Sequence, residues 1–275
     1  MTSDSGIQNQ ASTTSSDPTE AGGPLAAGSL QGKRALVTGS SRGIGADTAR
    51  YLAAAGASVV INYRQKAPRA NKLVAEIEAS GGTAIAIGTD LTDPAAVAAM
   101  FAQIDEAFGG LDILVLNASG GMESGVAEDY ALTLNRDAQV GVLDAALPLL
   151  APGSRVVFVT SHQAHFIHST PTMPEYQVVA VSKRAGEDAL RARIDELAAR
   201  DIGFTVVSGD MIEGTVTATL LERARPGAIG ARKEAAGRLY NVSEFAAEVA
   251  LAAVEPVPAG NTRYVGDLSS FTPGS

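Results

Sequence analysis

The strongest constraint on the fold is an alternation of short aliphatic runs with longer Ala-rich stretches of helical period, which begins near residue 30. Each aliphatic run is continuously apolar, as expected of a strand covered on both faces. The alternation predicts an α/β fold, a Rossmann-type doubly wound parallel sheet with helices on both faces and its ligand at the carboxyl ends of the strands. The expected strands are 33–38, 58–63, 83–87, 111–117, 155–160, 204–208 and 263–265, and the expected helices are 43–56, 67–80, 93–108, 125–150, 175–200 and 243–254.

Composition narrows the class of protein further. The 275 residues, 45% of them hydrophobic, suffice for one sizeable core, so we expect a single domain over residues 30–275. A net charge of −9 argues against nucleic acid or a membrane surface as partner, and no apolar run is long enough to span a bilayer. Residues 1–29 are polar and small, without the apolar block of a targeting signal. We expect a disordered tail there and a cytoplasmic protein.

A Gly-rich loop follows the first expected strand directly. Residues 38–45 read TGSSRGIG and lead into a helix. Glycines let the backbone turn sharply and approach a pyrophosphate, and the amino terminus of the helix offers free N–H groups and partial positive charge. Because the loop lies between a strand and a helix at the start of a βαβ unit, it predicts a dinucleotide site.

The end of the second strand indicates which dinucleotide binds. Proteins that prefer NAD place a carboxylate there for the ribose 2′-hydroxyl. This chain has Asn62, Tyr63 and Arg64 instead, and Arg42 lies in the Gly-rich loop. Two guanidinium groups without a competing acid suit a 2′-phosphate, so we expect NADPH as the cofactor.

The chain resembles the short-chain dehydrogenase/reductase family over about residues 32 to 267. The resemblance rests on TGSSRGIG, on Asp90-Leu91, on the NASG stretch from 117 to 120, and on Ser182-Lys183. It implies a homodimer or homotetramer with a small-molecule ketone as substrate. With the loop residues above, it implies that the cofactor contacts Gly39, Ser41, Arg42, Gly43, Ile44, Gly45, Asn62, Tyr63, Arg64, Asp90, Leu91, Asn117, Ala118, Ser119, Gly120, Lys183, Gly209, Met211 and Ile212.

The catalytic set of this family is Asn, Ser, Tyr and Lys, and one member is missing here. The resemblance assigns Asn135, Ser161 and Lys183 to three of the positions, but Val179 stands four residues before the lysine, where the tyrosine belongs. Hydride delivery to a ketone creates an alkoxide, and a donor aimed at that oxygen typically contributes about 10²–10⁴ in rate. Valine supplies no such donor.

Three groups could replace the tyrosine. Tyr176 lies three residues before Val179, a helical turn of roughly 4.5 Å away. A histidine of the segment SHQAHFIH could also give a proton. In the interpretation that we favour here, a phenolic hydroxyl of the substrate itself stabilises the oxygen, as in the atypical ketoreductases of angucyclinones, which this chain resembles. We expect no metal, since that segment has no carboxylate or cysteine. The expected substrate-contacting residues are His162, Gln163, His165, Phe166, Tyr176 and Val179.

Two functions therefore compete. The first is an NADPH-dependent ketoreductase that acts on a bulky, phenol-bearing polycyclic aromatic secondary metabolite, as in antibiotic biosynthesis. The second is a catalytically silent NADPH-binding sensor or scaffold. The retained catalytic residues favour the enzyme, because a pure binder needs only the phosphate loop. Residues 216–242 lack clean periodicity, and we expect them to form a mobile lid over the substrate.

Overall fold

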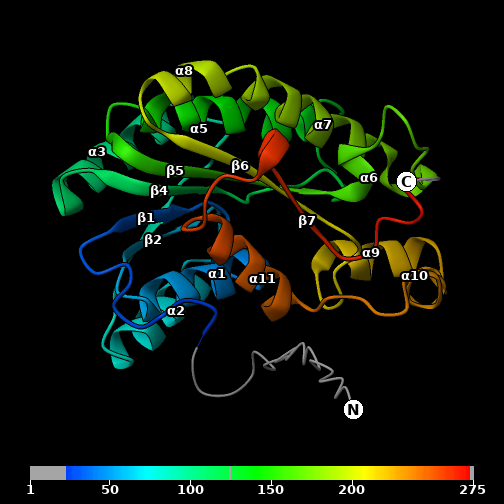
Figure 1. The fold of residues 1–275 in the computed structure, drawn as a ribbon, viewed down its shortest axis with the longest axis horizontal. Coiled ribbons are helices and arrows are strands. Elements are labelled where there is room, and N and C mark those ends of the chain that lie inside the picture. Colours follow the sequence, from blue (N-terminus) through cyan, green and yellow to red (C-terminus); the bar gives the residue numbers. More distant parts are fainter. Residues whose placement is uncertain (1–22, 124, 273–275) are drawn as a thin grey trace, which may run out of the picture.

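The computed structural model describes residues 23–123 and 125–272, which form a parallel seven-stranded sheet between two layers of helices (Figure 1). The strand order is β3-β2-β1-β4-β5-β6-β7, so the predicted Rossmann-type fold is confirmed. The strands are β1 (Arg34–Val37), β2 (Ser58–Tyr63), β3 (Thr83–Gly88), β4 (Leu111–Leu116), β5 (Leu150–Ser161), β6 (Gly203–Gly209) and β7 (Thr262–Val265).

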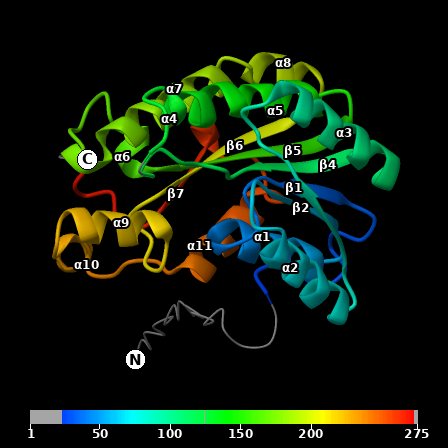
Figure 2. The same cartoon turned by 180° about the vertical axis from the view of Figure 1, so that it is seen from behind.

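Each face of the sheet has its own layer of helices, as the two opposite views show (Figures 1 and 2). Each face also has its own core of buried side chains. In β4, Ile113 and Val115 pack into one core and Leu114 and Leu116 into the other, which explains why the run from residue 113 to 116 is continuously apolar. One face carries α1 (Gly43–Ala54), α2 (Ala67–Ala79) and α11 (Val242–Ala252). The other carries α3 (Pro94–Phe108), α5 (Ala138–Ala146), α7 (Gln177–Arg191) and α8 (Ile194–Ala199).

The start of α3 is as the sequence predicts. Asp93 is the N-cap and its carboxylate accepts hydrogen bonds from the N–H groups of Ala95 and Ala96, while Pro94 occupies the first turn.

Two expected helices are interrupted. The stretch 125–150 contains α4 (Tyr130–Leu132), a π-helical turn η1 (Thr133–Asp137) and α5 before β5 begins. The stretch 175–200 begins with a 3-10 turn, η2 (Pro174–Tyr176), and is then divided into α7 and α8. The π-turn lies where α7 comes closest, since a Cβ built on Gly186 would be 1.9 Å from the carbonyl oxygen of Asn135.

The segment 216–242, expected to form a lid and without a clear helical period in its sequence, contains two helices, α9 (Val216–Ala224) and α10 (Ala228–Ala236). Thr215 caps α9 by accepting the N–H of Ala218. The guanidinium group of Arg232 holds α10 against the body through Asp210 at 2.8 Å and Asp267 at 2.9 Å. These contacts come from distant parts of the chain, which local periodicity does not report. Two short turns complete the elements, α6 (His162–His165) and η3 (Ala259–Asn261).

The amino-terminal stretch is described only from residue 23, so most of the expected tail lies outside the described residues. Within residues 23–29, Leu25 packs against the core below α1, and the following Leu30 is buried. Among the described helices, none combines the length and the apolar character needed to cross a bilayer.

The contact at Gly186 yields a stability prediction. Gly186→Ala should lower the free energy of unfolding by about 1–3 kcal/mol or more, because backbone on both sides has to move apart. The matched control is Gly230→Ala in α10, where an added Cβ meets nothing within 4 Å and alanine favours the helix by up to about 1 kcal/mol. Urea unfolding of both variants measures the difference, and equal effects would contradict the close packing.

Candidate active site

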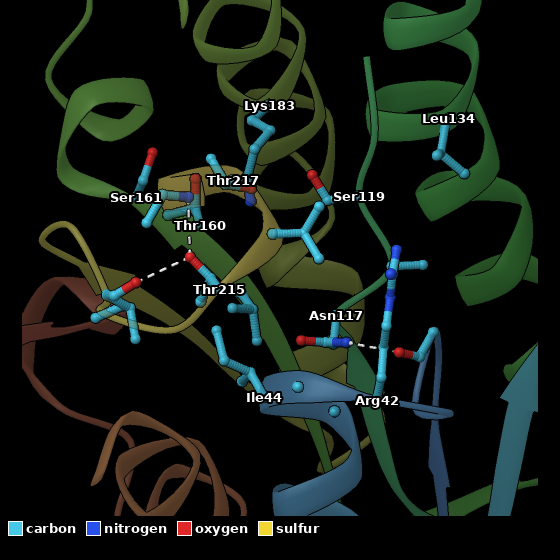
Figure 3. A pocket seen from close by; sticks show the side chains of 18 of the residues that line it. Arg42, Ile44, Asn117, Ser119, Leu134, Thr160, Ser161, Lys183, Thr215 and Thr217 are labelled. Carbon is cyan, nitrogen blue, oxygen red and sulfur yellow. Dashed lines mark hydrogen bonds between the residues drawn. The ribbon is translucent and has the colours of Figure 1, made fainter. Parts of the chain in front are cut away.

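A cavity of about 620 Å³ opens at the carboxyl ends of the strands, as the fold class predicts (Figure 3). Ser161, Thr160 and Lys183 gather at one end of it, and Arg42 and Asn117 lie toward the other. The predicted residues on its wall are Gly39, Ser41, Arg42, Gly43, Ile44, Gly45, Asn62, Tyr63, Arg64, Asp90, Leu91, Asn117, Ala118, Ser119, Ser161, His162, Gln163, Tyr176, Lys183, Gly209, Met211 and Ile212. Those that do not line it are Gly120, Asn135, His165, Phe166 and Val179.

Hydrogen bonds between strand ends hold the Gly-rich loop in place. The Thr38 hydroxyl accepts the N–H groups of Asn117 and Ala118, at 2.9 and 3.0 Å. Asn62 accepts the N–H of Gly39 on Oδ1, at 3.0 Å. Gly39 has a φ of +63°, and a Cβ there would lie 3.0 Å from the Cα of Ala118. A larger residue would therefore strain the loop and push the two strand ends apart.

The loop end of the cavity suits an anion. In the part of the chain that the structure describes, no side chain caps the start of helix α1 after Arg42. The first N–H groups of the helix are therefore available at the cavity wall. Arg64 stands nearby, where its guanidinium group donates to the Tyr130 hydroxyl. Lys66 and Arg69 line the same wall and were missed by the sequence analysis, although basic residues directly after β2 were a usable signal.

Asp90 presents an ionised acceptor to the same cavity. Partial burial acts to raise the pKa of this carboxyl, but hydrogen bonds from Thr92 and the charge of Arg64 outweigh it and leave the pKa below its ordinary value. The Thr92 hydroxyl and N–H lie 2.7 and 3.0 Å from Oδ1.

The opposite end of the cavity brings two hydroxyl groups together. The phenol oxygen of Tyr176 lies 3.2 Å from Oγ of Ser161, and the Tyr176 side chain is buried. Burial raises the pKa of Tyr176, and the Ser161 bond opposes this only partly. The phenol is therefore protonated at neutral pH and available as a donor.

Asn135 and Lys183 are linked through Ser182, which directly precedes the lysine on α7. Asn135 is buried and joins three segments, because its Nδ2 donates to the Gly120 carbonyl and to Oγ of Ser182, both at 2.9 Å. Lys183 follows Ser182 on α7 and points into the cavity (Figure 3). Burial lowers the pKa of Lys183 to about 8, although the charge of Glu187 opposes the shift.

The three histidines differ in their burial and in their hydrogen-bond partners. His162 is fully buried, its Nδ1 lies 2.8 Å from Oγ of Ser208, and burial lowers its pKa to about 4. The ring nitrogens of His165 lie 2.7 Å from Glu187 and 3.0 Å from the Tyr264 hydroxyl, outside the cavity. His168 is exposed. No group of three or more His, Cys, Asp or Glu side chains suited to a metal ion occurs in residues 23–123 and 125–272.

Part of the wall beside Tyr176 is apolar and comes from segments that the sequence analysis left unassigned. Leu221 and Ala218 of α9 line the cavity and belong to a small core with Tyr176, Val179 and Met211. Their signal was the Thr215 cap, which marks the start of a helix. Other wall residues that were missed are Gln65, Thr89, Glu123, Tyr130, Leu134, Val159, Thr160, Asp210, Gly214, Val216, Thr217 and Phe245.

Comparison with known proteins gives the family. The family model for short chain dehydrogenases matches residues 33–225. The chain belongs to the short-chain dehydrogenase family. It is therefore an oxidoreductase, and the alternative of a protein built only to bind a nucleotide loses its support.

Two solved structures and a curated relative show what this short-chain dehydrogenase is similar to. A short chain dehydrogenase from Burkholderia cenocepacia, solved with NADP, is 34% identical with a TM-score of 0.72, over 87% of this chain and 98% of that one. The landomycin C-6 ketoreductase LanV, solved with NADP and rabelomycin, is 29% identical with a TM-score of 0.68, over 83% and 91%. Versicolorin reductase 1 of Dothistroma septosporum is 33% identical over 204 residues, which are 72% of this chain and 76% of that protein.

The buried His162 predicts how stability depends on pH. The pKa of His162 is about 4 in the folded protein and 6.5 when the side chain is solvated in the unfolded chain. As the pH falls below 6.5, the unfolded chain therefore takes up a proton that the folded chain does not. At pH 5 this destabilises the protein by about 2 kcal/mol relative to pH 7.5. His162→Gln, which can keep the bond to Ser208, should remove that loss. Urea unfolding at both pH values tests this, and an identical pH dependence in the two proteins would contradict it.

Proposed function

We propose that this short-chain dehydrogenase is an NADPH-dependent ketoreductase that reduces a ketone of a bulky, phenol-bearing polycyclic aromatic compound. Because Val179 has no proton to donate, the proton comes from another group. The observation that carries the proposal is the meeting of Ser161, Tyr176 and Lys183 at one end of a cavity whose other end suits a dinucleotide phosphate.

The described residues fit a nicotinamide dinucleotide. The uncapped amino terminus of α1 and the Gly-rich loop suit the pyrophosphate, and Asp90 and Asn117 line the cavity farther from Ser161. Lys183 would hold the ribose next to the nicotinamide. When bound, the reduced nicotinamide supplies a hydride. The protein supplies orientation, exclusion of water and a hydrogen-bond donor for the carbonyl oxygen.

The basic residues after β2 support NADPH over NADH. Arg42, Arg64, Lys66 and Arg69 line the cavity close to the end of β2, where no carboxylate follows the strand. The Tyr130 hydroxyl and ring hold the Arg64 guanidinium group, whose carbon lies 5.5 Å from the ring centroid. A guanidinium fixed in this way loses little further freedom when it binds a phosphate.

The substrate class is supported by the apolar wall and by the relatives. Met211, Ala218 and Leu221 offer apolar surface next to the hydroxyl pair, which suits a wide aromatic ring system. Similar proteins include a versicolorin reductase, a hydroxynaphthalene reductase-like protein and an angucycline C-6 ketoreductase.

We also propose that the protein is a cytoplasmic homodimer or homotetramer. Val178 and Val181 project from α7 with exposed fractions of 60% and 48%, which gives that helix an apolar face that a second copy can cover. Molecular mass in solution tests this, and a monomer at micromolar concentration would contradict it.

A ketone panel tests the reaction directly. Purified protein with NADPH and a set of polycyclic aromatic ketones should oxidise NADPH at 340 nm and yield the alcohol. Lys183→Ala should weaken cofactor binding and lower turnover, whereas Lys72→Ala, an exposed change on α2, should alter neither. Cofactor binding without reduction of any ketone would contradict the proposal.

Cofactor preference gives a second prediction. Arg64→Ala removes a charge-assisted bond of about 1.5–3 kcal/mol to the 2′-phosphate, so the Kd for NADPH should rise about 10–100-fold. The Kd for NADH should change little. Fluorescence titration measures both constants. Equal affinity of the unaltered protein for the two cofactors would show that the basic residues do not recognise the 2′-phosphate.

A further inference from the structure

The position four residues before Lys183 has lost its phenol, but a phenol reaches the same region from the preceding turn. Val179 and Tyr176 are both buried, with exposed fractions of 4% and 5%, and belong to one small core. Only Tyr176 carries a polar atom. Tyr176 lines the cavity, and its hydroxyl lies 3.2 Å from Oγ of Ser161, the one side-chain partner it has within residues 23–123 and 125–272.

We infer that Tyr176 is the proton donor of this enzyme, with Ser161 as the second hydrogen-bond partner of the carbonyl oxygen. The inference rests on the proposed ketone reduction and assigns its missing catalytic residue. The two hydroxyls are close enough for one carbonyl oxygen to accept from both, which is the arrangement that stabilises negative charge on that oxygen.

Local structure explains how a residue outside the helix reaches the site. Pro174 starts the 3-10 turn η2, which ends at Tyr176, and α7 begins one residue later. Tyr176 is the N-cap of α7, whereas Val179 lies within the helix. The phenol is also much longer than the valine side chain, so it spans the roughly 4.5 Å between successive turns. Val179 leaves the volume that the ring needs.

Other candidates in the protein are poorer donors. His162 has a pKa of about 4, so its ring carries no extra proton at neutral pH. The ring nitrogens of His165 face Glu187 and Tyr264 outside the cavity. The remaining alternative is a phenol of the substrate, which was our interpretation of the sequence. The geometry points to Tyr176 instead, because its protonated hydroxyl already lies beside Ser161.

The step balances with one proton from solvent as its only further reactant. The carbonyl carbon accepts the hydride and is reduced while the nicotinamide is oxidised. The electron pair of the carbonyl π bond moves to the oxygen, which takes the proton from the Tyr176 hydroxyl. The phenolate that remains regains a proton from water, which restores the resting enzyme.

Three variants and two substrates test the assignment. Tyr176→Phe removes only the hydroxyl, so kcat should fall about 10²–10⁴-fold while the Kd for NADPH stays within about twofold. Ser161→Ala should lower kcat as well. The matched control is Tyr51→Phe, which loses a hydroxyl bonded to Ser243 on the far side of α1 and should keep the kcat of the unaltered protein. The substrates are a phenol-bearing ketone and its methyl ether, which the unaltered protein should reduce at similar rates.

The outcomes separate this inference from the proposed function. If the unaltered protein reduces a ketone and Tyr176→Phe reduces it equally fast, the assignment of Tyr176 is wrong and the reductase function stands. Loss of the rate with the methyl ether alone would also overturn it, since the substrate would then be the donor. A loss in Tyr176→Phe that comes with weaker NADPH binding would show a structural role instead. If the unaltered protein reduces no ketone, both claims fall.

Discussion

The hydrogen bonds that join the carboxyl ends of β1, β2 and β4 are the constraint on which the rest of the site depends. Thr38 ties β1 to the Asn117 segment, and Asn62 ties β2 to the Gly-rich loop. Because β1 lies between β2 and β4 in the sheet, these bonds fix the loop at the point where the chain changes direction across the sheet. The amino terminus of α1 is thereby directed into the cavity. The backbone therefore sets both the partial positive charge and the shape of the loop end of the cavity.

A second set of contacts positions the side chains at the other end of the cavity. Asn135 in the π-turn bonds Gly120 and Ser182, and Gly186 lets α7 approach that turn to within backbone contact. Lys183 and Tyr176 lie on or directly before α7, so their distance from Ser161 depends on this packing. A π-turn at such a place costs regular helical bonding, and functional sites commonly contain one.

Much of the fold could be predicted from the sequence, since strands buried on both faces contain continuous apolar runs and caps such as Asp93 have a local cause. Residues at the cofactor end of the cavity could also be predicted from the sequence, because glycines and basic residues act there through backbone geometry and charge. Tertiary contacts decided what was missed. Helix α10 is held by ion pairs of Arg232 with Asp210 and Asp267, and the orientation of Tyr176 depends on the turn before α7 and on space beside Val179.

We propose that the phenol of Tyr176 takes the place of the tyrosine that is missing at residue 179. A crystal structure of the protein with NADP and a ketone substrate tests it most directly. The account predicts that the carbonyl oxygen lies within about 3 Å of both the Tyr176 hydroxyl and Oγ of Ser161. A carbonyl oxygen bonded only to a phenol of the ligand itself, with Tyr176 turned away from it, would contradict the account.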